Sequence, residues 1–527
     1  MTGKEKKAII VTSNSAGDRE VLADLLRCYG YTAVEEGGEG LPEGYWEGRE
    51  AAVCADPGAY GPEAPPRLNI FWEAGQGAVT MSWREPDRQR AGERIIRQEE
   101  QVRPAPFREA AENRRRRVLR LCFHRLVTKM AAFRPSPWGV LTGVRPTKVV
   151  QRFLDEGLDR TAILESLERD YGIDGEQAGI LWRIAAGQRP FLPGLEENRD
   201  RISVYIGYPF CPSRCSYCSF PGYDLKKWRK QQPRCVEAML REIRAVGERA
   251  RELGFKVQTL YFGGGTPTAM SPEQMDSLLA AARDSFALLP DCEWTIEGGR
   301  PDTLTEEMLR TIAVYPVKRV CINPQSMQAA TLERIGRRHT PEEIRETFRR
   351  VRRISRELNL NWLINSDLIL GLPGEGAADV AATLEKLLVF RPENITVHSL
   401  AIKRGSTFQE NRPDLPPLDE ALTMAAAVRG KLAEAGYLPY YLYRQKEILA
   451  AGENTGYTLP GKACLYNILM IEERQTILGL GVGAGSKYLT RGSWSLENEY
   501  NPKDLIQYIE RIADLIQRKV DKLGEIG

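Results

Sequence analysis

From about residue 201 the chain alternates between short apolar runs and longer amphipathic runs, and this alternation constrains the fold more than any other feature. Strands that alternate with helices imply a parallel sheet with right-handed crossovers. Six such units are typical of a barrel or an incomplete barrel, in which ligands gather at the carboxyl ends of the strands. The sequence predicts strands near 202–208, 256–262, 292–297, 318–323, 362–369 and 394–398, and helices near 229–252, 271–286, 305–313, 328–357 (broken at Pro341) and 377–389.

The regions on either side of this core have other patterns, and together they predict four parts. Residues 1–134 carry short strands near 8–12 and 31–35, a helix near 17–30 and a hairpin at 68–85, which is typical of a small α/β domain, and then a long helix near 108–132. Residues 135–200 show three helical patterns before a Pro-rich linker. The core occupies 201–436, and residues 437–527 form a small C-terminal domain with an aromatic strand at 437–443 and a last helix near 502–522.

The overall charge and hydropathy of the chain argue against several classes of protein. A net charge of +3 in 527 residues does not indicate the strongly basic surface that binds nucleic acid. No apolar stretch reaches the length of about 18 residues that a membrane-spanning helix needs, and the N-terminus has no signal peptide. We therefore expect a cytoplasmic protein, acting as a monomer, whose ten cysteines stay reduced.

Three of these cysteines, Cys211, Cys215 and Cys218, stand in a C-x-x-x-C-x-x-C spacing directly after the first predicted core strand. Thiolates are the ligands of iron–sulfur clusters. A four-iron cluster held by three cysteines keeps one iron open to a small molecule, as catalytic metal sites generally do. A closed zinc site is the alternative, but it needs a fourth ligand, and no second cysteine pair or histidine lies nearby.

Further motifs follow the later strands. Gly263, Gly264 and Gly265 with Thr266 come after the second strand and let the backbone approach a ligand closely. Glu297 ends the third strand, where a carboxylate could bind an ammonium group or a ribose hydroxyl, or form a salt bridge with Arg300. The glycine-rich stretch 479–485 lacks the pattern of a P-loop and is interpreted as a close-packed turn.

These motifs, in this order, resemble those of the radical S-adenosylmethionine (SAM) superfamily. The likeness rests on the cysteine motif with Tyr205 and Tyr217, on the stretches 261–268 and 367–374, and on Gln325 and Arg337. Together they look like the oxygen-independent coproporphyrinogen III oxidase (dehydrogenase) family, in its branch with a long N-terminal extension. The resemblance covers roughly residues 135–500 and implies an incomplete (β/α)6 barrel.

The resemblance also implies cofactors and roles for single residues. The three cysteines would bind one [4Fe-4S] cluster, whose open iron would hold SAM. One electron would cleave SAM to a 5'-deoxyadenosyl radical that abstracts hydrogen from the substrate, while the protein positions the cofactor. The residues that the resemblance assigns to SAM are Tyr205, Tyr217, Gly264, Gly265, Thr266, Glu297, Gln325, Arg337 and Asp367.

The substrate implied by the family is coproporphyrinogen III, two of whose propionates would be oxidatively decarboxylated to the vinyl groups of protoporphyrinogen IX, in haem biosynthesis. The partners would be a reducing, flavodoxin- or ferredoxin-like electron donor and a terminal electron acceptor that the sequence does not identify. Four propionates call for cations beside flat aromatic walls. The candidates are Arg300, Lys403, Arg404, Arg444 and Lys446, with Tyr440, Tyr441 and Tyr443.

Two positions depart from the pattern of the family's dehydrogenases. Phe220 stands where a fourth cysteine follows the third by two residues, and Gly207 replaces a histidine four residues before the first cysteine. Phe220 is also typical of related proteins that bind haem and deliver it to other proteins. Two alternatives therefore remain: a haem chaperone that keeps the cluster without decarboxylating, and a radical SAM enzyme that acts on another substrate.

Overall fold

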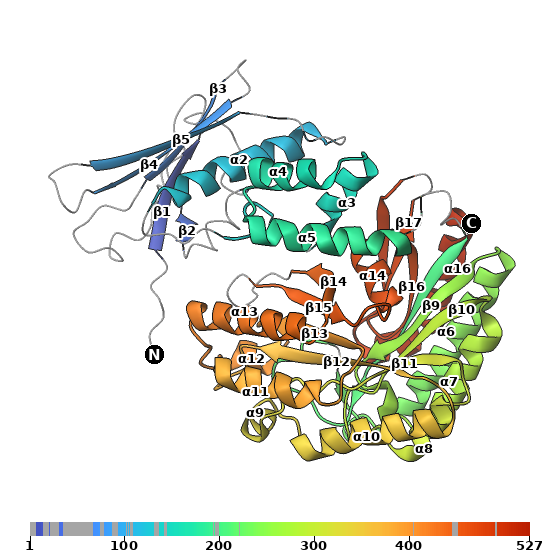
Figure 1. The fold of residues 1–527 in the computed structure, drawn as a ribbon. Coiled ribbons are helices and arrows are strands. Elements are labelled where there is room, and N and C mark those ends of the chain that lie inside the picture. Colours follow the sequence, from blue (N-terminus) through green and yellow to red (C-terminus); the bar gives the residue numbers. More distant parts are fainter. Residues whose placement is uncertain are drawn as a thin grey trace, which may run out of the picture. The chain divides into compact units, whose positions relative to one another are not determined.

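A computed structural model provides the structure of the chain, which divides into two compact units, residues 1–186 and 187–527 (Figure 1). Each unit has a hydrophobic core of its own. Among the described residues, no helix is both long and apolar enough to cross a bilayer. The residues that the structure describes are 7–13, 21, 31–34, 67–73, 78–86, 93–101, 103, 105, 109–130, 136–141, 145–192, 194, 200–220, 222–403, 405–444, 452–490 and 493–527.

The first unit contains a five-stranded sheet in the order β2-β1-β3-β4-β5. Its strands are β1 (Lys7–Ser13), β2 (Tyr31–Val34), β3 (Arg67–Glu73), β4 (Ala78–Pro86) and β5 (Glu93–Gln101). Strand β1 pairs in parallel with β2 and β3, whereas β4 pairs antiparallel with β3 and β5. Helix α2 (Ala111–Thr128) packs on this sheet, because its Phe123 and Leu126 share a core with Met81 and Trp83.

The sequence missed β5, because the edge strand is too charged to show an alternating apolar pattern. The helix predicted at 17–30 lies almost wholly outside the described residues. Helices α3 (Thr147–Asp155), α4 (Arg160–Tyr171) and α5 (Gly175–Gln188) match the three helical patterns expected before the linker.

The second unit is an incomplete (β/α)6 barrel, as predicted. Its six parallel strands are β6 (Arg201–Tyr208), β9 (Lys256–Gly264), β10 (Leu288–Glu297), β11 (Val317–Cys321), β12 (Leu363–Leu370) and β13 (Asn394–Ser399). They alternate with α6 (Gln232–Glu252), α7 (Pro272–Ser285), α8 (Glu306–Ile312), α10 (Pro341–Glu357) and α11 (Ala377–Leu388), and α13 (Leu418–Glu434) follows the last strand (Figure 1). A short helix, α9 (Ala329–Arg334), precedes the predicted break at Pro341. The carboxyl ends of all six strands face one cavity.

The C-terminal residues extend the barrel sheet at both edges. Strands β14 (Leu438–Tyr443) and β15 (Asn454–Thr458) join the β13 edge, and β16 (Thr476–Gly481), β17 (Gly485–Leu489) and β18 (Leu496–Tyr500) join the β6 edge. Helix α14 (Leu465–Glu472) connects the two sets. Where the sequence predicted one last helix near 502–522, the structure has two, α15 (Leu505–Glu510) and α16 (Ile512–Ile526).

The glycine-rich stretch is the end of β16 together with the turn into β17. A Cβ atom on Gly481, whose φ is +94°, would lie 2.2 Å from the carbonyl oxygen of Gly207 on β6. The two strands can pair this closely because position 481 is glycine. Buried Glu242 of α6 accepts a 2.7 Å hydrogen bond from the Gly481 amide and pairs with Lys519 of α16 at 3.1 Å, which ties the turn to the C-terminal helix.

Candidate active site

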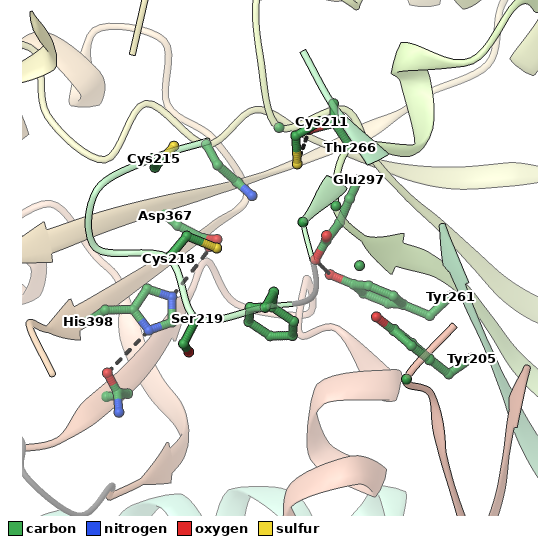
Figure 2. Close-up of a pocket in the computed structure, with 18 of the residues that line it drawn as sticks. Tyr205, Cys211, Cys215, Cys218, Ser219, Tyr261, Thr266, Glu297, Asp367 and His398 are labelled. Atoms are coloured by element: carbon green, nitrogen blue, oxygen red, sulfur yellow. Dashed lines mark hydrogen bonds and ion pairs between the residues drawn. The ribbon is translucent and has the colours of Figure 1, made fainter. Parts of the chain in front are cut away.

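The cysteine loop begins where β6 ends, and hydrogen bonds hold it on several sides. Strand β7 (Phe210–Cys211) pairs with β8 (Tyr223–Asp224). The amide of Ser216 donates to the carbonyl of Ile335 at 3.0 Å, and the amide of Phe408 donates to the carbonyl of Ser216 at 3.1 Å. Loops that follow different strands therefore fix the positions of the three thiols (Figure 2).

Two buried arginines converge on Cys215. Nη2 of Arg300 donates to Sγ of Cys215 at 3.2 Å, and its Nη1 donates to Oγ of Ser213 at 2.6 Å. Burial by itself would raise the pKa of the Cys215 thiol, but the positive charges of Arg337 and Arg300 outweigh it and lower that pKa. The site thus stabilises this sulfur as the thiolate, the form that binds metals.

Among the described residues, no arginine donates a hydrogen bond to the thiols of Cys211 and Cys218. Cys211 accepts a weak hydrogen bond from Oγ1 of Thr266 at 3.5 Å (Figure 2). Burial raises the pKa of Cys211 and brings the pKa of Cys218 to about 11. In the part of the chain that the structure describes, no three Cys, His, Asp or Glu side chains surround a point that a single metal ion could fill.

The glycine segment after β9 packs against the cysteine loop. A Cβ atom on Gly265 would lie 2.5 Å from the carbonyl oxygen of Phe210, and one on Gly264, whose φ is +105°, would lie 2.8 Å from that of Tyr208. The sequence predicted that these glycines let the backbone approach a ligand. The structure shows that the close approach is to the chain itself, although both glycines also line the cavity.

Stacked tyrosines and one carboxylate form a wall of the cavity. The rings of Tyr261 and Tyr466 stack at 4.4 Å, and Tyr205 stacks beside Tyr261 at 6.1 Å. The Tyr261 hydroxyl donates to Oε1 of Glu297 at 2.6 Å (Figure 2). Burial raises the pKa of Glu297 to about 7, although the hydrogen bond from Tyr261 opposes the change.

Arg300 and Glu297 do not form the salt bridge that was one interpretation of their spacing. The Arg300 guanidinium binds Ser213 and Cys215, whereas Glu297 binds Tyr261. Only 4% of the Arg300 side chain is exposed. It therefore supports the cysteine loop, and it also lines the cavity.

Gln325 and Asp367 lie together on neighbouring strand ends. Gln325 has a φ of +66°, which is strained for a non-glycine residue, and its amide donates to the carbonyl of Asp367 at 3.0 Å. Oδ2 of Asp367 lies 3.9 Å from Nε2 of His398 (Figure 2). The other ring nitrogen, Nδ1, lies 3.2 Å from Oδ1 of Asn454. The sequence offered no signal for His398 beyond its place at the end of a strand.

One cavity of about 690 Å³ brings all of the predicted site residues together. Four of the basic or aromatic residues predicted for the substrate also line it: Arg300, Lys403, Tyr441 and Tyr443. Tyr440 and Arg444 are not among the lining residues, and Arg404 and Lys446 lie outside the described residues. The lining residues predicted from the sequence are Tyr205, Cys211, Cys215, Tyr217, Cys218, Gly264, Gly265, Thr266, Glu297, Gln325, Arg337 and Asp367.

Several buried polar atoms at this cavity have no partner within the described structure. They are Oε1 of Gln325, Oδ1 of Asn323 and Nε of Arg337. Buried polar groups are nearly always hydrogen-bonded, so unpaired atoms at a cavity indicate a polar ligand. The three thiols and these atoms fit an iron–sulfur cluster and a small polar cofactor.

Comparisons with known proteins agree with this site. The family model of the Radical SAM superfamily matches residues 205–387. The chain is 40% identical over 392 residues to the oxygen-independent coproporphyrinogen-III oxidase-like protein HemZ of Bacillus subtilis. The aligned residues are 74% of this chain and 77% of HemZ. The chain therefore belongs to the radical SAM superfamily and, within it, to the coproporphyrinogen III oxidase-like family of HemZ, as the motifs predicted.

Two further relatives are more distant. The haem chaperone HemW of Escherichia coli is 28% identical over 286 residues, which are 54% of this chain and 70% of HemW. The structure of the E. coli coproporphyrinogen III oxidase HemN, a radical SAM enzyme, aligns with a TM-score of 0.49 at 21% identity, covering 63% of this chain and 73% of that one.

Proposed function

We propose that this protein is a radical SAM enzyme that oxidatively decarboxylates coproporphyrinogen III to protoporphyrinogen IX. The observation that carries the proposal is the cavity itself, in which a three-cysteine loop, unpaired polar atoms and stacked tyrosines meet at the ends of the barrel strands. The relation to HemZ supports a tetrapyrrole as the substrate.

Each cofactor has residues suited to hold it. Cys211, Cys215 and Cys218 would bind a [4Fe-4S] cluster, and Arg337, Glu297, Gln325 and Asp367 would bind SAM beside it. When bound, the two groups supply a carbon-centred radical that removes a hydrogen atom from the substrate. The stacked tyrosines would keep water from this side of the cavity.

On the substrate side, Lys403 is the cation best placed to bind a propionate. It lines the cavity together with Tyr441 and Tyr443, and burial lowers its pKa. A carboxylate bound there would favour the charged form of the lysine. Conversion of a propionate to a vinyl group releases carbon dioxide with one hydrogen atom and one electron, and the electron requires an external acceptor.

A haem chaperone is the second candidate, and one observation favours it. Phe220, at the position of the expected fourth cysteine, lines the cavity and is 58% exposed. An exposed aromatic ring at a cavity can stack on the face of a porphyrin. The same ring could equally hold the flat substrate of the enzyme.

The test is anaerobic reconstitution of the cluster, followed by incubation with coproporphyrinogen III, SAM and dithionite. We expect protoporphyrinogen IX, and we expect Cys215→Ala to lose both bound iron and product. Cleavage of SAM without this product would contradict the proposed substrate. Stoichiometric binding of haem without release of carbon dioxide would establish the chaperone instead.

A further inference from the structure

A dense group of positive charges follows the cysteine loop, between β8 and the first turn of α6. Its members are Lys226, Lys227, Arg229, Lys230 and Arg234, and all five side chains are exposed. We name this group the basic turn. Residues 222–236 contain a single carboxylate, Asp224, whose Oδ1 accepts hydrogen bonds from the backbone amides of Lys226 and Lys227 at 2.9 and 3.4 Å.

The charges of the basic turn are not compensated. Among the described residues, none of the five cations forms an ion pair with a carboxylate. Helix α10, which is just as rich in arginine, behaves differently. There Arg345 and Arg349 share Glu342 at 2.7 and 3.0 Å, and Arg353 pairs with Glu306 at 2.7 Å. A solvated helix face tends to pair its charges, so an unpaired group of one sign points to a partner of the opposite sign.

The basic turn is joined directly to the first cysteine. Cys211 pairs with Asp224 across β7 and β8, and the amide of Leu225 donates to the carbonyl of Cys211 at 3.0 Å. The ring of Trp228, within the basic turn, lies 5.0 Å from that of Tyr223, which is 6.1 Å from Phe210. Hydrogen bonds and aromatic rings thus connect the surface with the thiol by a short route.

We infer that the basic turn is the docking surface for a small acidic protein that donates one electron at a time to the cluster. This inference rests on the proposed function, because it assumes a cluster on the three cysteines. In the step, the donor loses one electron and the cluster gains it, and no bond of the chain forms or breaks. Opposite charges raise the rate of such encounters by about 10- to 1,000-fold at low ionic strength.

Nucleic acid and anionic membranes are less suitable partners. The basic turn is confined to one short segment, and the chain as a whole carries a net charge of only +3. Binding to nucleic acid needs basic residues along an extended face. An electron donor would account for the place of these charges on the segment that pairs with the strand of Cys211.

The experiment mixes reduced flavodoxin, an acidic flavoprotein, with the cluster-loaded full chain in a stopped-flow instrument and follows flavin oxidation. The test variant is Lys226→Glu/Lys227→Glu. The control variant is Arg241→Glu/Arg244→Glu, which makes the same charge change at exposed positions further along α6. Binding of oxidised flavodoxin, measured by calorimetry at several salt concentrations, is a second readout that does not require the cluster.

We expect the test variant to lower the second-order rate constant at least tenfold at low salt, and the control variant to lower it no more than about twofold. The difference should shrink at high salt, where surface charges are screened. Equal rates and affinities for the two variants would overturn the inference. The inference would also be overturned if the test variant lost binding to duplex DNA or anionic vesicles while flavodoxin still reduced it at the normal rate.

Failure of the proposed function gives a separate result. The electron paramagnetic resonance signal after dithionite reduction reports whether wild type and variants hold the cluster. Wild type without that signal would contradict the proposed function. The calorimetric comparison on the same chains would still decide the docking surface, since the exposed substitutions leave the fold intact.

Discussion

At the scale of single residues, Glu297 is a titratable carboxylate in the cavity that we propose for SAM. Burial raises the pKa of Glu297 to about 7, and the Tyr261 hydroxyl donates a hydrogen bond to its carboxylate. Below pH 7 the carboxyl group is therefore mostly protonated and cannot pair with an ammonium group. Its ionised fraction falls about tenfold for each pH unit below the pKa.

We predict that the affinity for SAM weakens as pH falls from about 7 to 6, a range in which the amino group of SAM keeps its proton. Equilibrium dialysis with the cluster-loaded protein should show a dissociation constant rising several-fold over that interval. Glu297→Gln should bind SAM weakly at both pH values, with little pH dependence. An unchanged slope in this variant would assign the titration to another group.

At the scale of elements, helix α14 carries Tyr466 into the cavity wall, and a buried ion pair fixes where this helix begins. Nε of Arg319 on β11 pairs with Oε2 of Glu293 on β10 at 2.7 Å, and only 2% of Arg319 is exposed. Oε1 of Glu293 accepts the amide of Leu465 at 2.8 Å. Cys464, the N-cap residue, makes no side-chain capping bond, so Glu293 takes that role from another element.

We predict that Glu293→Leu destabilises the barrel unit by about 3–5 kcal/mol, because it leaves the buried Arg319 charge unpaired. Urea unfolding followed by tryptophan fluorescence measures the change. Glu306→Leu is the matched control, since its partners Arg310 and Arg353 are exposed, and it should have a much smaller effect. Equal losses in the two variants would contradict the role given to Glu293.

At the scale of the whole molecule, every residue that lines the cavity lies between 205 and 500, within the unit 187–527. The core of that unit draws on none of the strands β1 to β5, and the core of the first unit draws on none of the barrel strands. Each unit thus has what a separately folding domain requires.

We predict that a fragment of residues 187–527 folds by itself and binds as much iron per chain as the full protein. Iron and sulfide analysis after anaerobic reconstitution gives the comparison. Calorimetry of the full chain should show two unfolding transitions, one of which the fragment reproduces. An insoluble or iron-free fragment would show that the barrel depends on the first unit.

The barrel strands and the three thiols could be predicted from the sequence alone, because they depend on local periodicity and on a motif placed at a strand end. Gln325, Arg337 and Asp367 were predicted only through the resemblance to the radical SAM family. The sequence analysis missed β5 and the strands from β15 to β18, which lack an alternating apolar pattern, and it could not place the C-terminal strands at both edges of the sheet. Pairing between distant segments depends on geometry that no local pattern contains.

The roles of single side chains became clear only from the packing of the folded chain. Arg300 could have been a substrate ligand or a partner of Glu297, and the fold instead places its guanidinium on Cys215. Gly264 and Gly265 approach the backbone of the cysteine loop, and His398 reaches Asp367 from the neighbouring strand. The direction of a side chain depends on the packing of residues far away in the chain, and the sequence pattern around it does not specify that packing.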